Sequence, residues 1–295
     1  MRVVATTREL QALAEGWRAE GRRIALVPTM GALHAGHLAL VREARRRADR
    51  VVVSLFVNPT QFDQRADLLA YPRTGEADRE ACREAGVDVV FAPSETELYP
   101  EGAQTVVEVP GLAAPLCGAS RPGHFRGVAT VVTKLLVAAR PHVAVFGRKD
   151  FQQLRVVERL VRDLGFDVEV VGVPTVREPD GLALSSRNVH LGPEARAEAL
   201  VLPRALDAAE AATRAGERSA EALLALARRE VAKAPSARLD YAELRDPEDL
   251  APAPERLCGP TLLALAAFFP GRDGGAVRLI DHRVLPAEAP KEDGT

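Results

Sequence analysis

The chain has 295 residues, a length typical of about two domains. With 47% hydrophobic and 27% charged residues, its composition excludes a collagen-like, coiled-coil or largely disordered protein. The formal net charge of −2 leaves no positive excess for unspecific binding, so neither nucleic acid nor a membrane surface is expected as a partner.

The first part of the chain alternates between apolar runs and amphipathic helical patterns. After a short N-terminal strand and helix, strands are predicted at residues 24–27, 51–57, 87–91, 143–146 and 168–173, and helices at 38–48, 74–85, 127–139 and 150–164. The β-branched run 51–57 is typical of a strand buried on both faces. Strands that alternate with helices favour βαβ units. We therefore predict an α/β domain with a Rossmann-like parallel sheet at residues 1–175.

The pattern changes after residue 173. Ala-rich helices are expected at 193–215 and 219–234, and three shorter, alternating strands at 239–244, 262–268 and 276–280. This predicts a second, smaller α+β domain at residues 176–295. Its last residues, 287–295, are expected to be frayed.

Cysteine usage and the length of the apolar runs suggest a compartment. Cys82, Cys117 and Cys258 are odd in number and far apart, so a disulfide framework or a cysteine zinc site is not expected. The N-terminus lacks the apolar core of a signal peptide, and the longest apolar run, 262–269, is too short to span a membrane. The sequence predicts a cytoplasmic protein.

The turn after the predicted strand 24–27 carries the first chemical motif, Met-Gly-Ala-Leu-His-Ala-Gly-His at residues 30–37. Gly31 and Gly36 have the spacing of a P-loop, but His37 stands where a P-loop needs lysine, and no G-x-G-x-x-G fingerprint occurs. What remains is H-x-G-H at a helix N-terminus. There, two imidazoles and free N–H groups suit a phosphate, and Gly36 lets a nucleotide approach the backbone. The alternatives are two histidines that cap a turn, or zinc, for which two ligands do not make a site.

Residues 27–37 resemble the signature of the pantoate–β-alanine ligase family, within the H-x-G-H nucleotidylyltransferase superfamily. Further segments agree in order: FVNPTQF at 56–62, YPRT at 71–74, RPGHFRGV at 121–128, GRKDFQQL at 147–154, and VPTVRE at 173–178 with LSSRN at 184–188. The similarity covers roughly residues 3–283. It implies that pantoate attacks the α-phosphorus of ATP to give pantoyl adenylate and pyrophosphate. β-Alanine then attacks the acyl carbon, which gives pantothenate and AMP.

The resemblance also implies the residues of an ATP site. These are Met30, Gly31, Ala32, Leu33, His34, Ala35, Gly36 and His37, then Gly147, Arg148, Lys149 and Asp150, then Val176, Leu184, Ser185, Ser186 and Arg187 of the second domain, which would act as a lid. His37, His34 and Lys149 are the catalytic candidates. The family's proton donor corresponds to His37, whose pKa near 6.5 the phosphates would raise; charge stabilisation is at least as well suited, because pyrophosphate is a good leaving group. Lys149 is one of only four lysines among 39 basic residues, and Arg148 replaces a common glutamate.

By the same resemblance, Gln61 and Gln153 hold pantoate, and Gln61 also meets β-alanine. Asn58 either anchors its loop or touches β-alanine, and Arg121 reaches pantoate or a phosphate. Mg²⁺ is expected on the triphosphate with Asp78 as its candidate ligand. The alternative for Asp78 is an acidic first turn of a helix. The family is generally dimeric, which implies a homodimer, and the segment 100–115 is either an interface or core.

Two rival functions remain. A nucleotidylyltransferase that makes a dinucleotide shares H-x-G-H and Ser-Ser-Arg but has no need for the paired glutamine segments. The second rival is a catalytically inactive regulator that binds a nucleotide. The intact H-x-G-H motif and Lys149 argue against this function.

Overall fold

The computed structural model describes the chain except for residues 63–67, 70 and 287–295. The tail predicted to be frayed therefore lies outside the described residues. The chain divides into two compact units, Met1–Val176 and Arg177–Thr295. In the described residues, no helix is long and apolar enough to span a bilayer.

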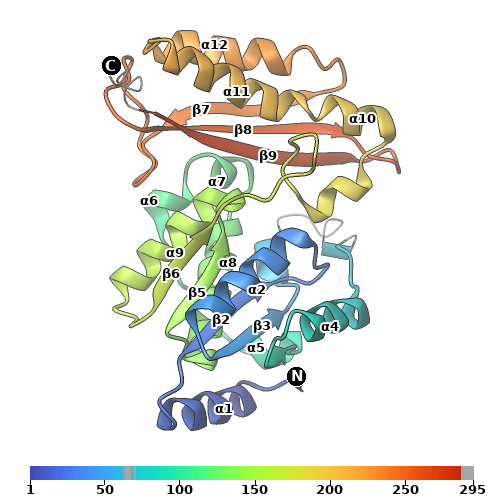
Figure 1. Cartoon of the computed structure of the whole chain (residues 1–295), viewed down its shortest axis with the longest axis vertical. Coiled ribbons are helices and arrows are strands. Elements are labelled where there is room, and N and C mark those ends of the chain that lie inside the picture. Colours follow the sequence, from blue (N-terminus) through green and yellow to red (C-terminus); the bar gives the residue numbers. More distant parts are fainter. Residues whose placement is uncertain (63–67, 70, 287–295) are drawn as a thin grey trace, which may run out of the picture. The chain divides into compact units, whose positions relative to one another are not determined.

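The N-terminal unit is built on a parallel sheet of six strands, which confirms the predicted Rossmann-like class (Figure 1). Its strands pair in the order β1 (Arg2–Val4), β4 (Val89–Phe91), β3 (Arg50–Leu55), β2 (Ile24–Thr29), β5 (Val143–Gly147) and β6 (Glu169–Val173). Val51, Val52 and Val53 of β3 are each at most 1% exposed. Successive side chains point to opposite faces, so the continuous β-branched run reflects burial on both.

Helices cover both faces of this sheet. The longer ones are α1 (Thr7–Ala19), α2 (Ala35–Arg47), α4 (Gly75–Glu84), α8 (His124–Ala139) and α9 (Phe151–Asp163), and the short ones are α5 (Glu95–Leu98), α6 (Pro110–Ala113) and α7 (Cys117–Ser120). Leu40 and Val41 of α2 and Cys82 of α4 pack on one face, against Val27 and Val53. Helices α8 and α9 contact each other and the sheet.

The order of the strands creates a switch point between β2 and β5. From β2 the chain moves through α2 to β3, and from β5 it moves through α9 to β6 on the other side. In open parallel sheets, ligands bind outside the carboxyl ends of the strands at this point. The H-x-G-H segment follows β2, and the Gly-Arg-Lys-Asp segment lies at the end of β5. The topology therefore places both predicted motifs at one edge of the sheet.

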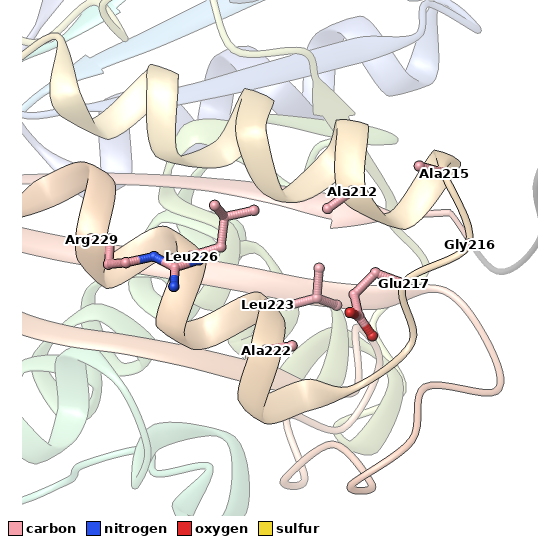
Figure 2. Close-up of a pocket in the computed structure, with 8 residues that line it drawn as sticks. All are labelled: Ala212, Ala215, Gly216, Glu217, Ala222, Leu223, Leu226 and Arg229. Carbon is pink, nitrogen blue, oxygen red and sulfur yellow. The ribbon is translucent and has the colours of Figure 1, made fainter.

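The C-terminal unit combines an antiparallel sheet with helices. The sheet consists of β7 (Arg238–Arg245), β8 (Thr261–Pro270) and β9 (Ala276–Leu285), and the helices are α10 (Pro193–Glu198), α11 (Val201–Arg214) and α12 (Ala220–Val231). A hollow of about 460 Å³ is lined by residues of α11, α12 and the loop between them, among them Leu223, Leu226, Glu217 and Arg229. Figure 2 draws the side chains that line it. None of the predicted site residues lines it.

Two predictions for this unit were wrong in detail. The single helix expected at 193–215 is interrupted between α10 and α11, because Pro203 cannot donate to the carbonyl one turn earlier. Strands β8 and β9 are each ten residues long rather than short. Asp281, which breaks the apolar pattern of β9, is 3% exposed and accepts hydrogen bonds from both terminal nitrogens of Arg177, at 2.7 and 2.9 Å. The strand thus continues beyond the predicted end at residue 280, because Arg177, itself partly exposed, neutralises the buried Asp281.

Candidate active site

The turn of residues 30–37, the H-x-G-H turn, binds its own backbone through both histidine rings. The Gly36 N–H donates to His34 Nδ1 at 3.1 Å, and the His34 N–H donates to His37 Nδ1 at 3.3 Å. The ring centroids lie 4.1 Å apart. Because each Nδ1 accepts, a neutral ring must carry its proton on Nε2. The turn therefore holds two neighbouring Nε2–H donors.

The electrostatic surroundings keep these rings neutral. Burial lowers the pKa of His37 to about 3; His34 and Lys149 act in the same direction, and Asp150 opposes them. Burial also lowers the pKa of His34, again helped by Lys149 and opposed by Asp150. Burial thus holds the pKa of His37 well below its ordinary value of 6.5, and the increase expected from bound phosphates stays a prediction. Neutral rings favour charge stabilisation over proton transfer.

Gly36 leaves room for the imidazole ring of His34. A Cβ on Gly36 would lie 2.8 Å from Cε1 and 2.9 Å from Nδ1 of His34. We expected Gly36 to leave room for a nucleotide, but in the structure the imidazole of His34 occupies this space. The glycine is needed for the ring to reach the backbone N–H.

The backbone of the H-x-G-H turn is bound by the carboxylate of Asp78, in the first turn of α4. Its Oδ2 accepts from the Ala32 N–H at 3.0 Å, and its Oδ1 accepts from the Leu33 N–H at 2.8 Å. The Gly31 N–H donates to Thr29 Oγ1. The N–H groups of Gly31, Ala32 and Leu33 are therefore bound by the protein's own acceptors. In the helix N-terminus, where free N–H groups were expected, that of Gly36 is bound by His34.

Asp78 also stabilises an unusual backbone conformation. Gly31 and Ala32 have φ of +86° and +51°, and the left-handed region is unfavourable for alanine. The carboxylate is 4% exposed and accepts a third hydrogen bond from Thr74 Oγ1. A carboxylate has about four lone-pair sites, so Asp78 has at most one left for a metal ion. In the described residues, no cluster of three or more histidine, cysteine or carboxylate side chains could hold a metal.

Replacing Asp78 by asparagine is expected to destabilise the protein by about 1–3 kcal/mol, because one buried backbone N–H loses its acceptor. The displaced turn should also lower kcat/KM for ATP by roughly tenfold, since a small misplacement of catalytic groups is costly. Denaturant unfolding and steady-state kinetics measure the two effects.

Asp88→Asn is the matched control for this variant. The Asp88 Oδ2 accepts from the Val51 N–H at 2.8 Å, at the amino end of β3 and away from the turn. This variant should lose stability while it keeps the kinetics for ATP. Equal kinetic losses in both variants would contradict the role of Asp78.

Gln61 lies at the end of the short helix η1 (Pro59–Gln61), after β3. It is 8% exposed, and its Nε2 lies 3.0 Å from Sδ of Met30, which joins it to the H-x-G-H turn. Its backbone carbonyl accepts from Arg121 at 3.1 Å and contacts the His124 ring at 2.8 Å. Gly127 allows α8 to approach, because a methyl group there would collide with the Thr60 carbonyl. Arg121 therefore contacts Gln61, and the predicted contacts of both residues with substrate stay predictions.

Asn58 anchors this loop. It is 1% exposed, and its Nδ2 donates to Gln61 Oε1 and to the Gly127 carbonyl, both at 3.1 Å. Both amide protons are therefore used. Of the two roles considered for Asn58, the contacts favour the anchor.

Lys149 and Asp150 lie in η2 (Arg148–Asp150), directly after β5. Lys149 Nζ lies 4.0 Å from Asp150 Oδ1. Because β2 pairs with β5, η2 and the H-x-G-H turn follow neighbouring strands at the same edge of the sheet. The Arg148 Nε donates to the Gly172 carbonyl of β6 at 3.1 Å. Its side chain thus binds the sheet, and its predicted contact with ATP stays a prediction. Gly147 has open space where a Cβ would stand.

The two glutamines of α9 differ. Gln152 is 5% exposed and its amide binds the segment before α8, accepting from the Cys117 N–H and donating to the carbonyls of Leu112 and Pro115. Gln153, the predicted pantoate ligand, is only partly buried. No hydrogen bond among the described residues joins it to Gln61, so its role stays a prediction.

The remaining predicted residues belong to, or border, the C-terminal unit. Ser185 is the N-cap of η3 (Ser186–His190), and its hydroxyl accepts from the Arg187 N–H at 3.2 Å. The Asn188 Nδ2 donates to the Ala183 carbonyl, which closes this turn. Leu184 precedes the turn, and Val176 is the last residue of the N-terminal unit. Their contact with ATP stays a prediction.

Sequence reasoning missed Thr74 and Tyr99. Thr74 ends the segment YPRT, so its place in a matching segment could have identified it. Tyr99 binds Asn58 through its hydroxyl, and no local pattern indicates this.

Comparison with known proteins agrees along the whole chain. The Pantoate-beta-alanine ligase family model matches residues 2–284. The chain is 54% identical to a pantothenate synthetase of Myxococcus xanthus, over 97% of each chain, and 51% identical to one of Geobacter sulfurreducens, over 98% of this chain and 100% of the relative.

Solved structures agree as well. The crystal structure of pantothenate synthetase from Thermus thermophilus has a TM-score of 0.89 at 49% identity, covering 97% of this chain and 100% of the other. That of a pantoate–β-alanine ligase from Francisella tularensis, complexed with β,γ-ATP and β-alanine, has a TM-score of 0.77 at 32% identity, covering 96% and 97%. On this evidence, the chain belongs to the pantoate–β-alanine ligase family.

Proposed function

We propose that this chain ligates pantoate and β-alanine to pantothenate at the expense of ATP, through a pantoyl adenylate, with release of pyrophosphate and AMP. Membership of the family supports this reaction, and so does the Francisella relative complexed with β,γ-ATP and β-alanine. The observation that carries the proposal is the convergence of two Nε2–H donors and Lys149 at the switch point of the sheet.

The first step is adenylation. A pantoate carboxylate oxygen forms a bond to the α-phosphorus, and the bond from that phosphorus to the bridging oxygen of pyrophosphate breaks. His34 and His37 donate from Nε2 to phosphate oxygens, and Lys149 adds a positive charge. Such preorganised donors stabilise charge that develops in the transition state. Because both rings are neutral and bound by the backbone, they need little reorganisation during the step.

In the second step, the amine of β-alanine attacks the acyl carbon, AMP leaves, and the nitrogen loses its proton. Gln61 and Gln153 are proposed to hold pantoate during both steps, and Arg121 positions the backbone of Gln61. Ser185, Ser186 and Arg187 of the C-terminal unit, as the lid predicted from the sequence, are proposed to bind the β- and γ-phosphates. Two hydroxyls and a guanidinium suit such an anion.

Mg²⁺ is proposed to accompany ATP. With three hydrogen bonds already on Asp78, the ion would depend mainly on phosphate oxygens and water, as is common for Mg²⁺. It would neutralise charge on the pyrophosphate leaving group.

The chain is further proposed to act as a homodimer in the cytoplasm. Residues 103–108 belong to no helix or strand, and Val106 is 60% exposed, which suits contact with a second copy. Light scattering should then give twice the mass of 31.7 kDa. Two of the cysteines, Cys82 and Cys117, are buried thiols, as expected in a reducing compartment.

One assay tests the reaction. Pyrophosphate should be released from ATP only when pantoate is present, and AMP should follow only after β-alanine is added. Pyrophosphate release that does not require pantoate would instead support a nucleotidylyltransferase. ATP binding without turnover would support a regulator.

A further inference from the structure

Tyr99 lies directly after α5, far from the site residues in sequence. Its ring contacts Phe56, with centroids 6.3 Å apart, and Lys134 Nζ lies 5.3 Å from the ring centroid. Phe56 follows β3 and Lys134 belongs to α8. The ring is thus held by two elements that also border Asn58.

The hydroxyl of Tyr99 is one of three donors that fix the orientation of the Asn58 amide. It donates to Asn58 Oδ1 at 2.9 Å, where Thr60 donates from Oγ1 at 2.9 Å and from its backbone N–H at 3.4 Å. Tyr99 is the only one of the three that lies far from Asn58 in sequence. An oxygen that accepts three donors cannot exchange places with the NH₂ group without the loss of all three hydrogen bonds. The Nδ2 end of Asn58 must therefore face Gln61.

The Asn58 amide in turn orients Gln61. Because Asn58 Nδ2 donates to Gln61 Oε1, the oxygen of Gln61 points into the protein. Its Nε2 is the end that lies near Met30 in the H-x-G-H turn. One N–H of this group donates to Met30 Sδ, and the other remains as a donor that suits a carboxylate or hydroxyl oxygen rather than an ammonium group.

We infer that Tyr99 is a positioning residue for pantoate, whose hydroxyl acts through Asn58 to hold the amide of Gln61 with its N–H groups toward the substrate. The inference rests on the proposed pantoate role of Gln61. Burial raises the pKa of Tyr99, so its hydroxyl stays protonated and able to donate at neutral pH.

A double-mutant cycle with Tyr99→Phe and Gln61→Ala tests this. Tyr99→Phe keeps the ring and removes only the oxygen. It should raise KM for pantoate roughly fivefold, the scale of one buried hydrogen bond, with kcat within about twofold of wild type. In the Gln61→Ala background, where there is no amide left to orient, the same change should have no further effect on KM.

Tyr241→Phe is the matched control, because it removes the same atom from β7 in the C-terminal unit; it should leave KM for pantoate unchanged. An equal increase of KM from Tyr99→Phe in both backgrounds, or none in wild type, would overturn the inference. If Gln61→Ala alone leaves KM for pantoate unchanged, the proposed role of Gln61 fails, and the inference with it. Unfolding midpoints are measured for all four proteins. If Tyr99→Phe acts only by destabilising the fold, it should lower the midpoint and raise KM equally in the wild-type and Gln61→Ala backgrounds.

Discussion

Replacing His37 by alanine is expected to lower the rate of pantoate-dependent pyrophosphate release by ~10²-fold or more, the scale of one preorganised transition-state donor. The ring is partly buried, its pKa is lowered so that it is neutral, and its Nδ1 is bound by the His34 N–H. His34→Ala should have a similar effect, because the two rings lie only 4.1 Å apart. Single-turnover measurement of pyrophosphate release isolates this step.

His142→Ala is the matched control. His142 Nδ1 also accepts from a backbone N–H, that of Ile24 at 3.0 Å, but at the amino end of β2, opposite the H-x-G-H turn. This variant should lose stability and keep the rate of adenylation. Wild-type turnover of His37→Ala would contradict the assigned role.

Replacing Lys149 by arginine should lower kcat/KM for ATP by at least about tenfold although the charge is kept, and Lys149→Ala should lower it by ~10²-fold. The Lys149 side chain is 19% exposed and acts electrostatically on both histidines. We expect the loss because an ammonium is a compact point charge, whereas the larger planar guanidinium would present its charge at a different position. Steady-state kinetics with ATP varied measure the loss.

The control is Lys233→Arg, at a lysine that is 65% exposed in the C-terminal unit and paired with Glu230. It should behave as wild type. Near-normal kinetics of Lys149→Arg would remove the geometric reason for a lysine at this position.

The strands of the N-terminal unit could be predicted because burial on both faces requires a continuous apolar run, as in β3. The break between α10 and α11 was missed although Pro203 is visible in the sequence. The length of β9 could not be predicted, because Asp281 becomes compatible with the core only through Arg177, a partner 104 residues away.

The candidate site also contains residues that the sequence identified and roles that it did not reveal. His34, His37, Lys149 and Gln61 were named from the motifs that contain them, and the structure brings these residues to one edge of the sheet. The loop-stabilising role of Asp78 was not predicted: an acidic residue in the first turn of a helix has the same local pattern whether it binds metal, water or a distant loop. The purpose of Gly36 was likewise hidden, since the ring that fills its space belongs to His34.

The sequence by itself determined the α/β class and, through its motifs, the family, since apolar periodicity and motif residues are local properties. Only the tertiary structure decided which backbone N–H groups are already hydrogen-bonded within the protein and how the side-chain amides of Asn58 and Gln61 are oriented. Those properties depend on hydrogen bonds between distant segments: Ala32 to Asp78 is separated by 46 residues, Tyr99 to Asn58 by 41 and Asn58 to Gly127 by 69. Folding brings these partners together because the carboxyl ends of parallel strands share one edge of the sheet.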